Sequence, residues 1–463
     1  MHPALRHAAP EVLWLDHGDR PDPRPPLSGD ARADLVVVGG GYTGLWTALR
    51  ARERYPDLDV LLLEAGECGW QASGRNGGFA DASLTHGFGN GVARWPDELA
   101  ELDRLGADNL TAIEETVRRY GIDCGFERTG GLDVATAPHQ VEELAGLVDA
   151  RRAAGHDVHL LDAAQTRALV DSPTYLAAQH DPHGIAMLEP ARLAWGLRRA
   201  CLDLGVRIHE RTSVSGVRAS GAALAVTCAN GAVVRAGRVA LATNGFPPLL
   251  RRLRLMTVPV YDYVLATEPL SAAQRASVGW AGRQGVGDAA NLFHYYRLTR
   301  DDRILWGGYD AVYRYGSAIR PAFEQSGGTH DLLAGQFFET FPQLEGLGFS
   351  HRWAGVIDTS TRFAAFFGTA HGGRTSYALG YTGLGVAASR FGADVMLDLL
   401  HAEDTERTRR SMVRERPLPF PPEPFRAAGI NLTRWSLARS DERGGRRNLW
   451  LKALDRAGLG FDS

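Results

Sequence analysis

Three glycines near the N-terminus have the spacing that a dinucleotide-binding turn requires. Gly39, Gly41 and Gly44 form a GxGxxG pattern directly after the apolar run Val36–Val38. In such a turn the first glycine permits a tight bend, the second lets the backbone approach a pyrophosphate, and the third lets a helix pack closely on the preceding strand. A helix that begins at residue 42 would direct its free N–H groups and its positive dipole end at the phosphates.

An acidic residue stands where recognition of a ribose would need one. Glu64 directly follows the second apolar run, Val60–Leu63, about 20 residues after Gly44. A carboxylate at this position can accept hydrogen bonds from both ribose hydroxyls, and it would repel a 2′-phosphate. The strand, glycine turn, helix, strand and acid in this order predict a Rossmann unit, but they do not distinguish FAD from NAD.

Two further glycine-rich segments favour FAD. Residues 69–78 (GWQASGRNGG) contain too many glycines for a helix and offer Ser73, Arg75 and Asn76 as donors along a long ligand. Residues 380–386 (GYTGLGV) precede an expected helix that runs to about residue 400, so a second helix N-terminus would face the cofactor. A reduced flavin carries negative charge near N1 and C2=O, which a helix dipole stabilises.

Hydrophobic periodicity indicates the elements that must position these residues. Short apolar runs are typical of buried parallel strands, and apolar residues at helical spacing are typical of amphipathic helices. We expect helices over 42–55, 97–120, 138–154 and 191–204, and strands over 34–38, 60–63, 206–209, 224–227, 233–242, 257–267 and within 291–309.

This order of elements predicts an α/β (α+β) protein of two domains. A Rossmann unit opens the chain and a glycine turn with a helix closes it, so we expect a split Rossmann-type FAD-binding domain with an inserted substrate domain of mixed or antiparallel sheet. The expected boundaries are an N-terminal arm over 1–30, the FAD-binding domain over 31–96, 186–250 and 351–415, the substrate domain over 97–185 and 251–350, and a C-terminal tail over 416–463.

Composition limits the class of protein. The net charge of −3 provides no general attraction to nucleic acid or to an anionic membrane, so we expect neither as a partner. The four cysteines are far apart and form no CxxC pair, which predicts reduced thiols in a cytoplasmic protein and no metal site. No run of about 18 apolar residues and no signal-peptide core occurs, so no membrane span is expected.

Together these motifs resemble the FAD-dependent amino-acid and amine oxidase superfamily, which contains D-amino-acid oxidase, glycine oxidase and sarcosine oxidase. Within it, the chain is most similar to the gamma-glutamylputrescine oxidoreductase-like branch. The likeness covers roughly residues 30–400, and it is much more specific for FAD than for a substrate. The segments that carry it are 36–44 (VVVGGGYTG), 63–65 (LEA), 72–78 (ASGRNGG), 242–245 (ATNG), 352–357 (RWAGVI) and 380–385 (GYTGLG).

The resemblance implies a set of cofactor contacts. Residues 39–44 would bind the pyrophosphate, Glu64 the ribose and Val214 the adenine, while Gly355 and residues 382–384 would approach the isoalloxazine ring. Related sarcosine oxidases attach FAD through a cysteine in the C-terminal part of the chain. No cysteine follows Cys228 here, so FAD is expected to be non-covalent. The full set of expected contacts is Gly39, Gly41, Tyr42, Thr43, Gly44, Glu64, Ala65, Ser73, Gly74, Arg75, Asn76, Gly77, Gly78, Val214, Thr243, Asn244, Gly355, Tyr381, Thr382, Gly383, Leu384 and Gly385.

The inserted sheet is expected to form the substrate pocket. Aromatic faces attract an amine cation, and an arginine can hold an acidic group. The alternative for each aromatic residue is an ordinary place in the core of the sheet. Asp262 and Asp358 could bind an ammonium group, although structural roles are favoured for both. The candidate catalytic residues are Arg75, Tyr261, Tyr263, His294 and Tyr296.

The resemblance implies oxidation of the C–N bond of a small amine, either gamma-glutamylputrescine-like or an amino acid or other acid-bearing amine. Hydride transfer to flavin N5 would give an imine and then a carbonyl product, and dioxygen would be reduced to hydrogen peroxide. The alternatives are a dehydrogenase with another electron acceptor, a flavin monooxygenase that uses NADPH, and a scaffold without catalysis. The chain does not distinguish a monomer from a homodimer, and its basic segment 434–447 could be solvated or could touch a partner subunit.

Overall fold

The predicted glycine turn joins strand β1 (Ala31–Val38) to helix α1 (Tyr42–Arg54) in the computed structural model, which describes residues 1–460. β1 lies parallel to β2 (Val60–Leu63), in a register that runs from Leu35 opposite Val60 to Val38 opposite Leu63. All four residues of β2 are buried, because helices and further strands cover both faces of this sheet. The Rossmann unit expected at the start of the chain is therefore present.

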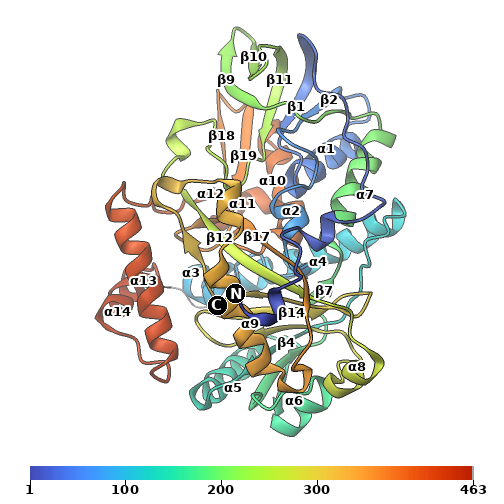
Figure 1. The fold of residues 1–463 in the computed structure, drawn as a ribbon. Helices are drawn as coiled ribbons and strands as arrows, with labels where there is room; N and C mark the ends of the chain where they lie inside the picture. Colours follow the sequence, from blue (N-terminus) through green and yellow to red (C-terminus); the bar gives the residue numbers. More distant parts are fainter. Residues whose placement is uncertain (461–463) are drawn as a thin grey trace.

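The first large sheet has eight strands and is mostly parallel. The order of its main path is β18-β19-β11-β1-β2-β8, and a β9–β10 hairpin extends from β11. Strands from the beginning, middle and end of the chain are thus neighbours, as the split domain predicts (Figure 1). The other bounds are β8 (Arg207–His209), β9 (Val214–Ser220), β10 (Ala223–Cys228), β11 (Val233–Leu241), β18 (Phe366–Ala370) and β19 (Thr375–Leu379).

The second large sheet has nine strands in the order β16-β12-β15-β14-β13-β4-β6-β5, with β17 paired to β12. All of its pairs are antiparallel except β13 with β4, so the inserted sheet is mixed, as expected. The bounds are β4 (Gly131–Ala135), β5 (His159–Asp162), β6 (Ala177–Asp181), β12 (Thr257–Thr267), β13 (Gly285–Asp288), β14 (His294–Leu298), β15 (Ile304–Gly308), β16 (Val312–Tyr313) and β17 (Phe349–Ser360).

A small antiparallel pair of strands and the helices complete the structure. The strands of the pair are β3 (Phe79–Asp81) and β7 (Ile185–Met187). No helix among residues 1–460 is long and apolar enough to cross a membrane. The helices are α2 (Ala72–Arg75), α3 (Phe88–Arg94), α4 (Leu99–Arg119), α5 (Pro138–Ala153), α6 (Ala163–Leu169), α7 (Pro190–Asp203), α8 (Ala272–Val278), α9 (Gly327–Thr340), α10 (Gly385–His401), α11 (Glu406–Arg409), α12 (Ser411–Arg414), α13 (Phe425–Asp441) and α14 (Leu449–Arg456).

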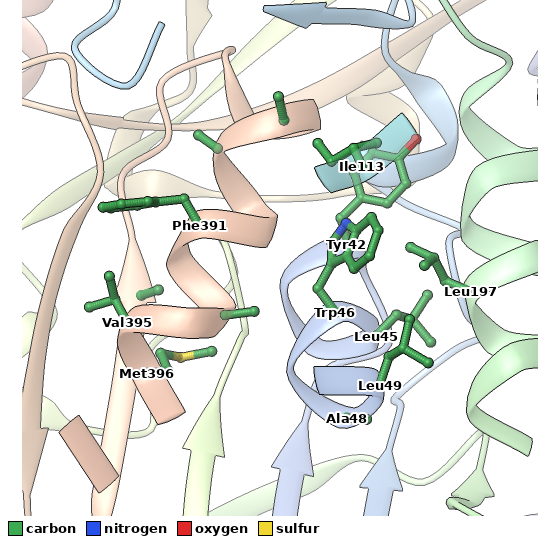
Figure 2. Close-up of a cluster of buried hydrophobic side chains, with 14 of the residues drawn as sticks. Tyr42, Leu45, Trp46, Ala48, Leu49, Ile113, Leu197, Phe391, Val395 and Met396 are labelled. Carbon is green, nitrogen blue, oxygen red and sulfur yellow. The ribbon is translucent and has the colours of Figure 1, made fainter. Parts of the chain in front are cut away.

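Helix α1 is the centre of the core beside the first sheet. Trp46 and Leu49 are fully buried, and the apolar cluster around them includes side chains from α4, α7 and α10 (Figure 2). An α-helix buried on nearly all sides needs apolar residues around most of its circumference, which α1 has. This packing fixes the direction in which the N-terminus of α1 points.

Two of the predicted domain boundaries differ from the positions at which the chain passes from one sheet and its core to the other. β17 pairs along its length with β12, so residues 351–360 belong to the second sheet rather than to the FAD-binding part. Helix α4 was expected in the substrate domain, yet Leu102 and Ile113 join the core around α1. Amphipathicity shows that a helix has an apolar face, but it does not show which sheet or helix that face covers.

The N-terminal arm and the C-terminal helices both pack onto the body. Trp14 in the N-terminal arm is buried, and its indole Nε1 donates to the carbonyl of Asn76 at 2.9 Å. The tail is not merely a solvated extension: it forms α13 and α14, which lie together at the left of the view in Figure 1. Leu437 of α13 and Leu451 of α14 are buried together with Leu292, and Arg434 forms an ion pair with Asp310.

Candidate active site

A cavity of about 1880 Å³ is lined by residues of both sheets and of the C-terminal helices. Ordinary small-ligand pockets occupy about 300–1,000 Å³, so this cavity has room for a dinucleotide and a substrate together. Of the expected cofactor contacts, nineteen line it: Gly39, Gly41, Tyr42, Thr43, Glu64, Ala65, Ser73, Arg75, Asn76, Gly77, Val214, Thr243, Asn244, Gly355, Tyr381, Thr382, Gly383, Leu384 and Gly385.

The first glycine turn can be built only from glycine at two positions. Gly39 has φ +110°, and a Cβ there would lie 2.4 Å from the carbonyl oxygen of Ala242. A Cβ on Gly44 would lie 1.8 Å from the carbonyl oxygen of Gly39. Gly44 does not line the cavity; it holds α1 against the turn, so its effect on a ligand is indirect. The N-terminus of α1 opens onto the cavity at Gly41 and Thr43, which is the arrangement that a pyrophosphate needs.

Glu64 is a buried carboxylate held at the cavity wall by three donors. Its Oε2 accepts from the N–H of Gly40 at 2.5 Å, and its Oε1 accepts from Gly66 N at 2.7 Å and Trp70 Nε1 at 2.9 Å. Burial raises the pKa of Glu64, and the three hydrogen bonds act in the opposite direction. The side chain is therefore held in one orientation at the cavity wall, where an acid that binds a ribose is expected.

Replacing Glu64 with glutamine is expected to raise the dissociation constant for FAD by about 10- to 100-fold, because an amide nitrogen would face N–H donors and a charged acceptor would be lost. Titration of flavin-free protein with FAD, followed by protein fluorescence, measures this constant. Glu67→Gln is the matched control, since Glu67 is in the same loop, pairs with Arg20 and Arg211, and does not line the cavity. Equal affinities in both variants would contradict this role of Glu64.

The segment from Ser73 to Gly78 lies between the two sheets. The Ser73 hydroxyl accepts from the N–H of Tyr42 at 2.8 Å, which ties this segment to the first turn of α1. Gly74 and Gly78 were predicted as cofactor contacts but do not line the cavity. Each packs against backbone instead: a Cβ would lie 2.1 Å from the carbonyl oxygen of Gly69 or Leu188, respectively.

Arg75 is buried at the edge of this segment and connects three parts of the chain. Its Nη1 lies 2.6 Å from Glu324 Oε2 and donates to the carbonyl of Ala354 at 3.1 Å, and its Nε donates to the carbonyl of Trp70 at 2.9 Å. Arg75 lines the cavity, so its guanidinium, paired with Glu324, is held beside the expected position of the flavin.

The second glycine turn is held by a buried aspartate. Asp358 of β17 accepts from the N–H groups of Gly380 and Tyr381, and desolvation by burial raises its pKa to about 7. Thr43 Oγ1 donates to the hydroxyl of Tyr381 at 3.1 Å, so the two turns meet although 338 residues separate them. Asp358 thus has the structural role that the sequence favoured, although it also lines the cavity.

Four of the predicted catalytic side chains lie on the face of the second sheet that points away from the cavity. The Tyr261 and Tyr263 hydroxyls donate to the carbonyls of Arg320 and Phe323, at 3.3 and 2.7 Å. His294 Nδ1 lies 2.6 Å from Asp288 Oδ2, and the Tyr296 hydroxyl lies 2.7 Å from that of Tyr175. None of the four lines the cavity, because the pleat directs them into the core against α9 and neighbouring segments; they are Tyr261, Tyr263, His294 and Tyr296.

The residues that alternate with these four face the cavity instead. Asp262 lies between the two tyrosines of β12, and Tyr295 lies between His294 and Tyr296 in β14. The Tyr295 hydroxyl donates to Asp262 Oδ2, and Asp262 is paired in register with Gly355. The alternation was visible in the sequence, but the choice of face was not, since a sheet buried on both sides has apolar residues in both sets.

The C-terminal helices form a part of the wall that the sequence did not predict. Phe420 and Ile430 pack against Val258 and Val260 of β12, and other residues of α13 and α14 line the cavity. Among residues 1–460 no group of three or more histidine, cysteine or acidic side chains could hold a metal ion. All four cysteines are free and buried.

The fold, and a cavity onto which both glycine turns open, are those of a dinucleotide-dependent oxidoreductase. The profile of the family DAO, described as FAD dependent oxidoreductase, matches residues 34–399, and the chain belongs to this family. It is an FAD-dependent enzyme, and the nineteen expected contacts that line the cavity fit that cofactor.

Named relatives agree with this assignment. The chain is 32% identical over 397 residues to "Gamma-glutamylputrescine oxidoreductase" of Escherichia coli (strain K12), which covers 82% of this chain and 86% of that protein. It is 29% identical over 396 residues to "Probable oxidoreductase OrdL" of Haemophilus influenzae, covering 82% and 85%. The crystal structure of glycine oxidase from Geobacillus kaustophilus has a similar fold, with a TM-score of 0.68, 20% identity, and coverage of 81% of this chain and 96% of that one.

Proposed function

We propose that this enzyme oxidises the C–N bond of a small amine. The observation that carries the proposal is the Tyr295–Asp262 pair, a polar group that lines the cavity beside Val258 and Val260 of β12. It lies opposite Gly355 in register, where the flavin ring is expected. The named relative from Escherichia coli supports an amine as the substrate class.

FAD supplies the chemistry by accepting a hydride from the carbon next to the amine nitrogen. The protein binds the substrate, orients it and shields it from water. The Asp262 carboxylate, fixed by the Tyr295 hydroxyl, holds the amine nitrogen, and desolvation by burial raises the pKa of Asp262 to about 6. At pH 7 and above Asp262 is therefore mainly ionised and can accept hydrogen bonds from the amine.

We further propose that the imine leaves the site and is hydrolysed to a carbonyl compound and a smaller amine or ammonia. Bound FAD would pass the two electrons to dioxygen, giving hydrogen peroxide. Anaerobic addition of primary and secondary amines to the yellow holoenzyme should bleach the flavin absorbance, and admission of air should restore it with one peroxide per amine. Restoration by a quinone analogue but not by air would favour a dehydrogenase, and a failure of every amine to bleach the flavin would overturn the proposal.

We expect the FAD to be non-covalent. The four cysteines are buried, and none of them lines the cavity, so no thiol is placed to bond to the ring. After precipitation of the holoenzyme with trichloroacetic acid, the yellow colour should remain in the supernatant. Colour in the protein pellet would show a covalent bond to another side chain.

A further inference from the structure

The N-terminal arm is attached to both large sheets. The N–H of Ala9 donates to the carbonyl of Ser350 in β17 at 2.8 Å, and the N–H of Leu27 donates to Thr212 Oγ1, shortly after β8, at 3.0 Å. Trp14 lies between these two attachments in the sequence, and it packs with Trp353 of β17 in one buried apolar cluster. The arm is therefore fixed on either side of Trp14, which limits how far this indole can move.

Two buried indoles hold consecutive carbonyl groups of the segment from Ser73 to Gly78. Trp353 Nε1 donates to the carbonyl of Arg75 at 2.8 Å, and Trp14 Nε1 donates to the carbonyl of Asn76 at 2.9 Å. Trp353 and Trp14 are 1% and 3% exposed, so water competes for neither hydrogen bond. Two adjacent peptide groups are thus fixed by side chains that are far apart in the sequence.

The bond from Trp14 determines which way the N–H of Gly77 points. A trans peptide group is planar, so its N–H points opposite to its C=O. The Asn76 carbonyl faces Trp14, which does not line the cavity, and the Gly77 N–H of the same peptide group therefore points away from Trp14. Gly77 is buried and lines the cavity, and its N–H has no acceptor within residues 1–460. The next N–H, that of Gly78, is already bonded to Asn76 Oδ1 at 2.8 Å.

The unsatisfied N–H of Gly77 indicates a ligand that carries an acceptor atom. Buried backbone N–H groups are almost always paired, either within the protein or with a bound molecule. The ring of Tyr295 closes one side of Gly77, where a Cβ would lie 2.7 Å from Tyr295 Cε2. An acceptor bound at this N–H would therefore lie near Tyr295, in the part of the cavity where the flavin ring is expected.

We propose that Trp14 and Trp353 are positioning residues for FAD. By holding the carbonyls of Arg75 and Asn76, they present the N–H of Gly77 to an acceptor atom of the isoalloxazine ring. No residue of the arm, 1–30, lines the cavity, so Trp14 acts on the cofactor only through this segment. The inference does not depend on the proposed function, because it requires bound FAD but no particular substrate.

The reduced cofactor should gain most from this donor. Reduction adds electrons to the isoalloxazine ring, and a preorganised N–H binds more strongly as negative charge develops in a site without water. Without an indole on its carbonyl, the Asn76 peptide group could rotate and turn the N–H of Gly77 away from the ring. Loss of either indole N–H is therefore expected to weaken the binding of reduced FAD more than that of oxidised FAD, which makes the midpoint potential more negative.

The test replaces each tryptophan with phenylalanine, which keeps an aromatic ring in the core but has no N–H. Titration of the holoenzyme with a reductant in the presence of a reference dye gives the midpoint potential of the bound flavin without any substrate. For Trp14→Phe we expect a more negative potential, equivalent to a loss of about tenfold in the preference for reduced over oxidised FAD. Trp353→Phe should change the potential in the same direction.

Trp280→Phe is the matched control. Trp280 is fully buried, its Nε1 donates to the carbonyl of Gln284 at 2.9 Å, and it does not line the cavity. This variant should lose about as much thermal stability as Trp14→Phe, since each loses one buried indole hydrogen bond, but it should keep the wild-type potential. Circular dichroism during heating compares the melting temperatures of the three variants.

An unchanged potential in both Trp14→Phe and Trp353→Phe would overturn the inference, because lower melting temperatures alone indicate a structural role. A change in Trp280→Phe as large as that in Trp14→Phe would also overturn it, since loosening of the core would then explain both. If a variant is recovered without FAD, titration of the flavin-free protein with oxidised and with reduced FAD gives the same preference as a ratio of dissociation constants, and an unchanged ratio counts against the inference.

Discussion

Replacing Gly44 with alanine is expected to abolish FAD binding and to lower the free energy of unfolding by about 3 kcal/mol. The new Cβ would lie 1.8 Å from the carbonyl oxygen of Gly39 and 2.9 Å from its carbonyl carbon. Both are backbone atoms, so α1 must move away from the turn, and its N–H groups then no longer face the pyrophosphate. The ratio of flavin to protein absorbance after purification measures the loss of FAD.

Gly146→Ala is the matched control for this substitution. Gly146 is also inside a helix, α5, but a Cβ there meets nothing within 4 Å. Alanine is favoured over glycine in a helix by about 1 kcal/mol, so this variant should keep its FAD and be slightly more stable. A Gly44→Ala protein that retains a full complement of FAD would show that contact between turn and helix is not required.

Replacing Arg75 with leucine is expected to slow flavin reduction by an amine by about 100-fold, the usual cost of removing one preorganised donor from an active site. The guanidinium lines the cavity and is fixed by the carbonyls of Trp70 and Ala354, and a leucine offers neither the charge nor these hydrogen bonds. Arg75→Lys should recover little, because an ammonium cannot replace the planar fork. Stopped-flow absorbance under anaerobic conditions measures the rate constant.

Glu324→Gln separates the function of Arg75 from its contribution to stability. This variant removes the partner at 2.6 Å but keeps the guanidinium and its two bonds to carbonyl groups. We expect a small change in melting temperature and a rate constant within about threefold of wild type, which is less than 1 kcal/mol. If Glu324→Gln slowed reduction as much as Arg75→Leu, the ion pair rather than the position of Arg75 would be responsible.

The residues expected to bind the cofactor could be predicted from the sequence because backbone geometry determines their types and spacing. The turn requires glycine at Gly39 and Gly44, and the position of Glu64 follows from the length of the helix between the two strands. The prediction for β12 also agreed with its observed bounds, 257–267, because alternation and β-branched residues mark a strand clearly.

The residues of the substrate pocket were harder to predict because their positions depend on how distant strands and helices pair and pack. Tyr261 and Asp262 are adjacent, and which of them faces a cavity is decided by the parity of the whole sheet. Asp133 and Gln179, which also line the cavity, come together only through the pairing of β4 with β6. The contribution of α13 was missed for a similar reason: its apolar residues fit Val258 and Tyr313, and this complementarity is absent from local periodicity.

The meeting of the two glycine turns sets the order in which the enzyme can be made. The hydroxyl of Thr43 meets that of Tyr381 across 338 residues, and α10 packs on α1 directly behind them. Protein synthesis proceeds at about 5–20 residues per second from the N-terminus. The first turn is therefore made well before its partner leaves the ribosome. The cofactor site can therefore be completed only near the end of translation, when Tyr381 and α10 have been made.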